Sequence, residues 1–182
     1  MAQFDFVTGA PEKYMPMVQE LTLIPGRVES VLSGHAARDL QRADEGEWSA
    51  GRVLSHMICY ARHNGDFIRL IAWMTNPERQ PWDEETEVTT EGLTTKSGAA
   101  LLESLSSAIA ETTELLSHTP DAQWGRPGTV PNFGLRSLRQ QLRAHIDHLG
   151  DHITQLEAQL AAPNPPPSPP SNPNRPAVRL PT

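Results

Sequence analysis

The chain has 182 residues, the length of one domain, and its single cysteine, Cys59, cannot form an internal disulfide bond. The net charge of −7 argues against a nucleic-acid partner, because binding to phosphates needs a clustered basic surface. There is no apolar run of about 18 residues and no basic N-terminal segment followed by an apolar core, which predicts a cytoplasmic protein with no membrane segment and no secretory signal.

The first predicted helix covers about residues 16–33, where apolar residues recur at helical spacing. Pro25 lies inside this segment and cannot donate a backbone hydrogen bond. The pattern therefore predicts either a kink at Pro25 or a helix that begins near Ile24.

The second predicted helix runs from about Ala50 to Met74, and Ser49 is placed to cap its N-terminus. Apolar residues surround most of its axis, which is typical of a buried helix. His56, Tyr60 and His63 share one of its faces. The two histidines are therefore expected to point toward the interior of the domain.

Two long connections flank the third predicted helix, which covers about residues 96–117. Residues 76–95 are polar and rich in Glu and Thr. The stretch "TPDAQWGRPGTVPNFG" carries glycines and prolines, and no segment of the chain predicts a strand longer than a few residues. Both stretches are therefore interpreted as loops.

The fourth predicted helix runs from about Leu135 to Leu160, with a leucine and isoleucine stripe as its core face. From residue 161 onward the chain is rich in proline, which predicts a disordered tail and a working domain of residues 1–160. Four helices with three connections predict an all-α fold, a four-helix bundle.

Three histidines form a second stripe on the fourth helix, beside the core face: His145, His148 and His152. His148 and His152 are four residues apart, about 6 Å along the axis, so their rings can bind one metal ion from the same side. The third ligand has to come from another helix, and His56 is the candidate. The alternative is that the pair is a chance feature of a polar helix face.

The remaining polar groups near these histidines are candidates for the wall of a pocket. His63 is two turns from His56 and is predicted to face the same cavity. His145 is interpreted as a neighbour of the ligands or a satisfied edge residue, and Tyr60 as a pocket residue on the same helix face. Cys59 is interpreted as plain packing, the usual role of a buried cysteine.

Two stretches resemble the DinB-like superfamily. "GEWSAGRVLSHMICYARHNGDFIRLI", residues 46–71, resembles its second helix, in which a Trp-Ser start leads into a helix with one histidine. "TPDAQWGRPG" followed by "LRQQLRAHIDHLGDHITQLEAQL" resembles its final segment, in which a histidine pair is followed by a glutamine. Together they cover about a third of the chain, and the helical layout agrees over residues 15–160.

The resemblance implies an up-down-down-up four-helix bundle in which three histidines hold a divalent metal. Gln155 matches the family's glutamine, and Asp151 stands where many members have another histidine. Trp48 matches the family's tryptophan and is interpreted as a packing residue. Carried over to this chain, the metal ligands are His56, His148 and His152.

An open site with three imidazoles suits zinc, nickel or iron and is typical of a catalytic centre acting on a small molecule. The resemblance implies, as first interpretation, a metal-dependent transferase that uses a low-molecular-weight thiol such as bacillithiol or mycothiol. Asp147 points away from the histidines and Asp151 lies on their outer side, so no carboxylate base is evident, and a thiolate needs none.

Two alternatives to thiol transfer stay open, and no catalytic residue is assigned. In the first, the protein is a metal-dependent hydrolase, with an acid such as Asp66 or one from residues 83–91 reaching the site. In the second, it is a non-catalytic metal-binding stress-response protein. A homodimer is also expected, because Trp73 and Met74 lie near a helix end that the bundle core does not fully cover.

Overall fold

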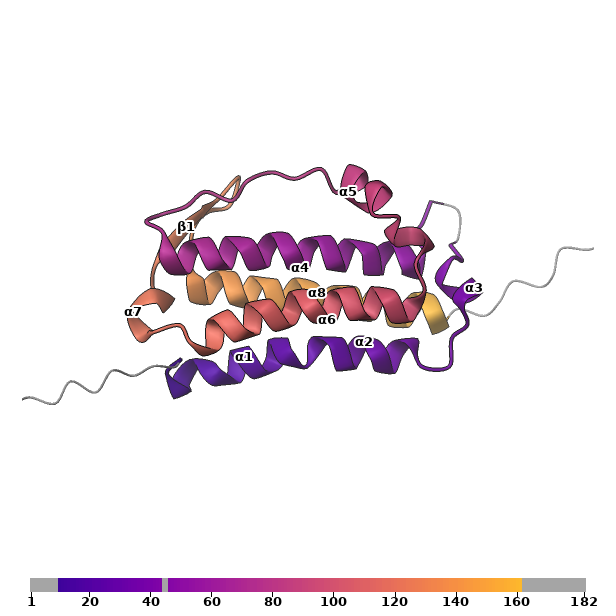
Figure 1. Ribbon diagram of the computed structural model, residues 1–182, viewed down its shortest axis with the longest axis horizontal. Coiled ribbons are helices and arrows are strands. Elements are labelled where there is room, and N and C mark those ends of the chain that lie inside the picture. Colours follow the sequence, from indigo (N-terminus) through magenta and orange to yellow (C-terminus); the bar gives the residue numbers. More distant parts are fainter. Residues whose placement is uncertain (1–9, 44–45, 162–182) are drawn as a thin grey trace, which may run out of the picture.

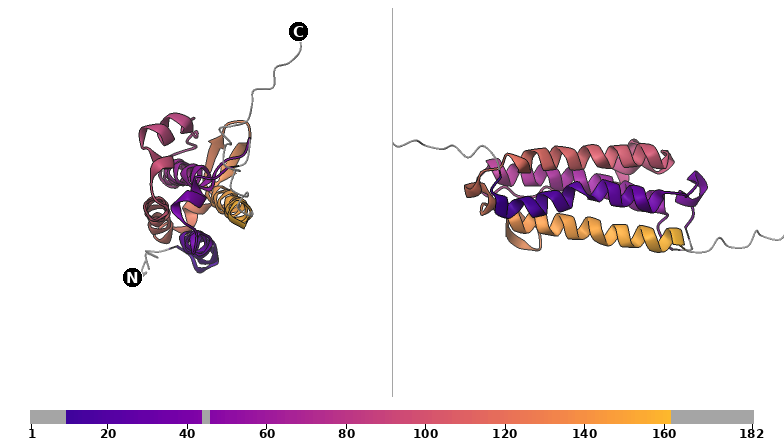
Figure 2. Two further views of the ribbon diagram at one scale, coloured as in Figure 1. Left: turned by 90° about the vertical axis from the view of Figure 1, so that its right-hand side faces the viewer. Right: turned by 90° about the horizontal axis from the view of Figure 1, so that it is seen from below.

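The computed structural model describes residues 10–43 and 46–161, and this part of the chain forms a bundle of four helical rods (Figures 1 and 2). The first rod consists of two shorter helices in line, and each of the others is a single long helix. The rods are α1 (Met15–Thr22) with α2 (Ile24–Leu32), α4 (Ala50–Trp73), α6 (Gly98–Ser117) and α8 (Leu138–Ala161). The predicted four-helix bundle is confirmed.

The rods follow an up-down-down-up course. In Figure 1 the first rod and α8 run in one direction along the bundle, whereas α4 and α6 both run in the other. Since α4 and α6 are parallel neighbours, the chain between them has to travel back along the length of the bundle before α6 begins.

The first rod is interrupted at Leu23, two residues before Pro25. Pro25 lies in the first turn of α2, where its missing N–H would have no intrahelical acceptor in any case. The break is shallow, because the Leu23 N–H still donates to the carbonyl of Gln19 and the Leu23 carbonyl accepts from Arg27. Each of the two alternatives left open by the sequence is partly right: a helix begins at Ile24, but the segment before it is helical as well, so the rod is interrupted close to Pro25.

Helix α4 is the central element. Its N-terminus is capped as predicted, with Ser49 Oγ accepting the Arg52 N–H at 3.2 Å. It packs against α6 and α8, and shorter elements contact its remaining sides. This surrounding explains why apolar residues occupy most of its circumference.

The return connection, residues 74–97, is not an irregular loop as predicted. It contains the helix α5 (Glu84–Thr90) and the short 3-10 helix η2 (Leu93–Thr95). Asp83 caps α5 by accepting the Thr86 N–H, and Val88 and Leu93 are buried against the bundle. Two apolar anchors and one cap are enough to order this segment, although it is too short to show clear periodicity.

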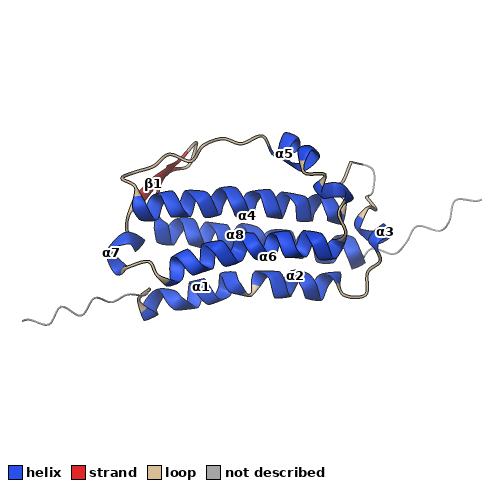
Figure 3. Cartoon of the chain, in the orientation of Figure 1, coloured by secondary structure: helices blue, strands red, loops and turns tan. Residues whose placement is uncertain are grey.

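The second predicted loop is also structured, and its two strands, of four residues each, are as short as the sequence allows. It holds the helical turn α7 (Asp121–Trp124) and an antiparallel hairpin of β1 (Pro127–Val130) and β2 (Gly134–Ser137), coloured red in Figure 3. Helix α8 consequently begins at Leu138 instead of Leu135. Leu135 belongs to β2 and is 65% exposed, so its assignment to the core stripe is also wrong.

Two more short elements complete the described residues: the 3-10 helix η1 (Glu12–Tyr14) and α3 (Ala37–Leu40). None of the helices in the described ranges is long and apolar enough to span a membrane. Residues 162–182, which contain nearly all of the predicted disordered tail, lie outside the described residues. Trp73 and Met74 are exposed, and the homodimer stays a prediction.

The hairpin approaches α4 closely at Gly128. A Cβ atom added there would lie 2.6 Å from Ile71 Cγ1 and 2.8 Å from Phe67 Cζ, well inside van der Waals contact. Glycine is therefore required at this position by the proximity of α4, and it fixes how near the hairpin lies to the bundle.

We expect Gly128→Ala to push the hairpin away from α4 and to lower the free energy of unfolding by about 1–3 kcal/mol, the usual cost of overpacking. Urea unfolding followed by circular dichroism measures this. Gly125→Ala is the matched control, because no atom lies within 4 Å of its added Cβ and its φ of −91° suits alanine. Equal stability of both variants would contradict the close approach.

Candidate metal centre

Three histidine side chains from two helices meet at the edge of the bundle. His56 comes from α4, and His148 and His152 come from successive turns of α8. His148 Nε2 lies 3.0 Å from His56 Nε2 and 3.2 Å from His152 Nε2. In the described part of the chain, no other group of three histidine, cysteine or acidic side chains brings its ligand atoms so close together.

The spacing of these nitrogen atoms fits a common metal ion. A cation bound at about 2.0–2.1 Å to three imidazoles, with angles of roughly 90–110°, separates the ligand nitrogens by about 3.0–3.4 Å. The two observed distances lie in this range. The triad can therefore hold a zinc, nickel or iron ion as one face of its coordination sphere.

The other ring nitrogens of two of these histidines are fixed by hydrogen bonds. His56 Nδ1 donates to Glu84 Oε2 at 2.6 Å, and His152 Nδ1 donates to Gln155 Oε1 at 2.9 Å. A proton held on Nδ1 leaves the lone pair of Nε2 free and directed at the shared point. The family glutamine, whose role the sequence did not reveal, thus orients one of the candidate ligands.

Burial keeps the histidines of α8 neutral. It lowers the pKa of His148 to about 4, with the charges of His152, His56 and Arg79 acting in the same direction. Burial also lowers the pKa of His152, against a smaller opposing effect of the bond to Gln155. Neutral imidazole is the form that binds a metal, so these two histidines do not have to lose protons at neutral pH.

Two of the predicted pocket residues, Tyr60 and His145, lie beside the triad. The Tyr60 ring centroid is 3.7 Å from that of His148 and 5.5 Å from that of His145. His145 is fully buried, and neither of its ring nitrogens has a hydrogen-bond partner among the described residues. Asn64 and Gln141 bond to each other nearby, Gln141 Nε2 donating to Asn64 Oδ1 at 2.8 Å.

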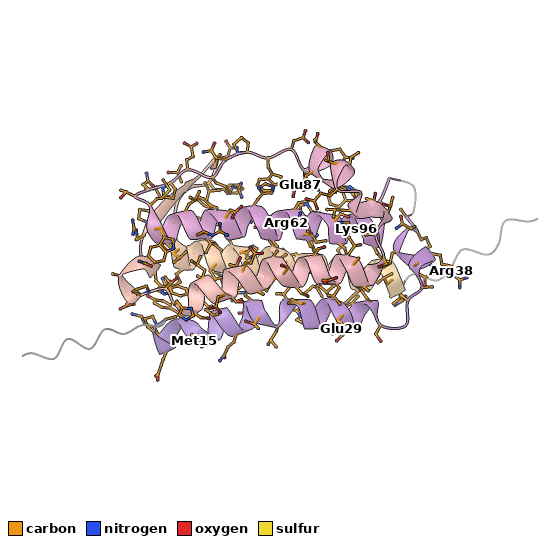
Figure 4. The ribbon with its side chains drawn as sticks, viewed as in Figure 1. Met15, Glu29, Arg38, Arg62, Glu87 and Lys96 are labelled. Carbon is orange, nitrogen blue, oxygen red and sulfur yellow. The ribbon has the colours of Figure 1, made fainter. Side chains whose placement is uncertain are left out.

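The third pocket candidate, His63, is engaged by the return connection. Its Nε2 donates to Glu87 Oε2 at 2.6 Å, and its ring stacks on Trp82 with centroids 4.8 Å apart. Figure 4 shows Glu87 on the connection and Arg62 on α4 below it, and these two residues are also paired. His63 therefore binds the covering segment and, within the described part of the chain, makes no hydrogen bond or ring contact with the triad.

The acids considered from the sequence fall into two groups. Asp147 pairs with Arg143, and Asp66 pairs with Arg69, both on exposed surface. The residues 83–91, by contrast, bring Glu84 to the triad. Asp147 and Asp66 are thus excluded from direct contact with the candidate ligands.

Sequence reasoning did not single out Glu84 itself or Trp82. The stretch "DEET" contains a weak signal for Glu84. Asp83 is a residue that can cap a helix, and the residue after it, Glu84, then becomes the first residue of that helix. Trp48, interpreted as a packing residue, lies with its ring centroid 5.5 Å from that of His56, so it forms part of the surroundings of the triad.

Comparison with known proteins identifies the family and the fold of the chain. The profile of the DinB superfamily matches residues 20–156. The chain belongs to the DinB superfamily. Among solved structures, this DinB-superfamily protein is similar to YfiT from Bacillus subtilis, described as a probable metal-dependent hydrolase with an unusual four-helix bundle topology.

The YfiT comparison has a TM-score of 0.72 at 19% sequence identity and covers 88% of this chain and 93% of the YfiT chain. At that identity the likeness establishes the fold of this DinB-superfamily member. No curated protein matches the sequence significantly.

We expect Glu84→Ala to weaken metal binding about 10- to 100-fold, because His56 loses the acceptor that fixes its tautomer and ring orientation. Glu85→Ala is the matched control: Glu85 is the next residue, is exposed and also pairs with Arg52, but does not contact His56. Competition with a chromogenic chelator measures both affinities. Equal affinities in the two variants would contradict the role of Glu84.

The buried His145 makes the native state less stable in acid. Burial lowers the pKa of His145 to about 3, with a smaller effect of His148, whereas the unfolded chain titrates near 6.5. As the pH falls below 6.5, only the unfolded state takes up this proton, so the native state loses up to about 1.4 kcal/mol per pH unit until its own pKa is reached.

We therefore expect His145→Phe to flatten the decline in stability of the metal-free protein between pH 7 and 5. His118→Phe is the control, because His118 is exposed at the end of α6. Urea unfolding in the presence of a chelator measures the slope. A wild-type slope in His145→Phe would show that other groups cause the decline.

Proposed function

We propose that the protein is a metal-dependent hydrolase of small molecules, with a divalent cation, zinc, nickel or iron, bound by His56, His148 and His152. The observation that carries the proposal is the convergence of three Nε2 atoms at 3.0 and 3.2 Å, which fits one cation and leaves the rest of its coordination sphere for water and substrate. When bound there, such a cation would lower the pKa of a water molecule and polarise the carbonyl group of a substrate.

The residues around the triad prepare it for this role. Glu84 and Gln155 hold protons on Nδ1 of His56 and His152, so the ligand nitrogens are directed before any ion binds. Tyr60 covers the His148 ring and keeps water away from that side. Burial raises the pKa of Tyr60, so its hydroxyl stays protonated and able to donate a hydrogen bond.

Hydrolysis is preferred over thiol transfer for two reasons. Beyond the family resemblance, the sequence favours thiol transfer because no carboxylate lies evidently beside the histidines, and Glu84 now stands next to one of them. YfiT, which shares the fold, is described as a probable metal-dependent hydrolase. Both points support water as the nucleophile.

Transfer of a low-molecular-weight thiol is the second candidate, and one observation favours it. Glu84 is held by both His56 and Arg52, with Oε1 at 2.9 Å from Arg52 Nη1, so its carboxylate is already committed to two partners. Hydrolysis usually employs a carboxylate that is free to accept a proton from water, whereas a thiolate needs no base.

We expect the metal-loaded protein to hydrolyse ester or amide substrates without any thiol, and His148→Ala to lower the rate by at least about 100-fold, the scale of losing one catalytic group. His118→Ala, which changes an exposed histidine away from the triad, serves as control and should be fully active. Bound metal is measured in each variant by elemental analysis.

A parallel assay offers a model electrophile with bacillithiol, mycothiol or glutathione. Conjugation that needs a thiol, is lost in His148→Ala and occurs without ester or amide turnover would replace hydrolysis by thiol transfer. Stoichiometric metal without either reaction would favour the non-catalytic metal-binding protein.

A further inference from the structure

Arg79 belongs to a part of the return connection that is tied to the hairpin. Its N–H donates to the carbonyl of Thr129 at 2.9 Å, and the Thr129 N–H donates to the carbonyl of Pro77 at 2.8 Å. Glu78 and Thr129 form a parallel β-bridge through these bonds. The backbone position of Arg79 is thus fixed by strand β1, and its side chain is half-buried.

Arg136 is positioned by the other strand. It pairs directly with Gly128, and directly opposed residues in an antiparallel hairpin share one face. Gly128 faces Phe67 and Ile71 of α4, so Arg136 lies on the face of the hairpin turned toward the bundle. The Arg136 side chain is half-buried there.

Neither guanidinium group has a carboxylate partner in the described part of the chain. Arg79 Cζ lies 5.5 Å from the centroid of the Trp82 ring, and Arg136 Cζ lies 5.0 Å from that of Phe133. The arginines of α4 behave differently: Arg52 and Arg62 each pair with two glutamates of the return connection.

A buried donor accompanies these charges. Trp82 Nε1 is buried and has no acceptor among the described residues. A buried N–H without an acceptor costs about 1–3 kcal/mol. The Trp82 ring contacts both the Arg79 guanidinium group and the His63 ring. An acceptor bound to Arg79 would therefore lie close to the indole of Trp82.

Both arginines border the face of α4 that carries His56. Arg79 packs against Trp82, whose ring stacks on His63, two turns along α4 from His56. Arg136 lies on the hairpin face turned toward Phe67, one further turn along the same face of α4. The two guanidinium groups are thus placed along the side of α4 on which the triad lies.

We propose that Arg79 and Arg136 bind an anionic group of the substrate, so that the substrates of this centre are small carboxylate- or phosphate-bearing molecules. A guanidinium group forms paired hydrogen bonds with a planar oxyanion, and stacking on an aromatic ring holds it ready for this contact. The inference rests on the proposed hydrolysis, since it names the substrate class of the same centre.

The test compares two esters that differ in charge, 4-nitrophenyl butyrate and mono-4-nitrophenyl glutarate, on the metal-loaded full chain. We expect the anionic ester to be preferred, and Arg79→Gln and Arg136→Gln each to lower its kcat/KM at least about tenfold, the loss of one charged hydrogen bond, and to lower the kcat/KM of the neutral ester far less. Arg79→Lys should retain part of the preference. Arg69→Gln is the control, because Arg69 is exposed and paired with Asp66.

A binding measurement separates this inference from the proposed hydrolysis. Isothermal titration of the metal-loaded protein with glutarate and with inorganic phosphate shows which oxyanion binds, and Arg79→Gln and Arg136→Gln should weaken the tighter one at least about tenfold. Binding that depends on the arginines without turnover of either ester would overturn hydrolysis and keep the anion site. No preference for the anionic ester together with binding unchanged in both variants would overturn the anion site, whatever the rate of hydrolysis.

Discussion

The parallel arrangement of α4 and α6 is the constraint on which the rest of the structure depends. Two parallel neighbours cannot be joined by a short turn, so residues 74–97 have to pass back along the bundle (Figure 1). That passage covers the outer side of α4 and carries Glu84 to His56 and Glu87 to His63. Two parts of the chain therefore build the candidate metal centre. The long helices supply the ligand nitrogens, and the return connection supplies Glu84, the acceptor that orients His56.

Ion pairs and buried apolar side chains together hold the covering segment to α4. Four ion pairs join Arg52 and Arg62 to glutamates in or directly after α5, and two buried apolar side chains, Val88 and Leu93, anchor the segment beneath them. The pairs that end at the exposed side chains of Glu85 and Glu91 are individually weak, about 0–1 kcal/mol, so opening this segment costs less free energy than unfolding the helices it covers. The contact of Glu84 with His56 consequently depends on how often the covering segment opens. Salt, which weakens the ion pairs, favours opening.

The long helices and the histidine pair of α8 follow from the sequence because their signals are local, whereas His56 was identified by its buried helix and by the family resemblance. Apolar periodicity marks the helices, and the i, i+4 spacing of His148 with His152 marks a pair that meets on one side. The helix α5, the hairpin and Glu84 do not follow, because distant contacts determine them. Gly128 is explained only by Ile71 of α4, and Thr129 pairs with a segment about fifty residues earlier in the chain. Leu135 was assigned to the fourth helix for the same reason. Periodicity alone begins the helix there, whereas the pairing of the hairpin keeps Leu135 in β2 and α8 begins at Leu138.

The separation between the helices and the covering segment bears on how such a protein diversifies. The ligand histidines lie on rigid helices whose packing tolerates few substitutions, whereas Arg79, Trp82 and Glu84 lie on one continuous stretch of connection. A change of length or composition in that stretch can alter the surroundings of His56 without repacking the core. The covering segment can thus vary between related proteins as a single short block of sequence while the bundle stays the same.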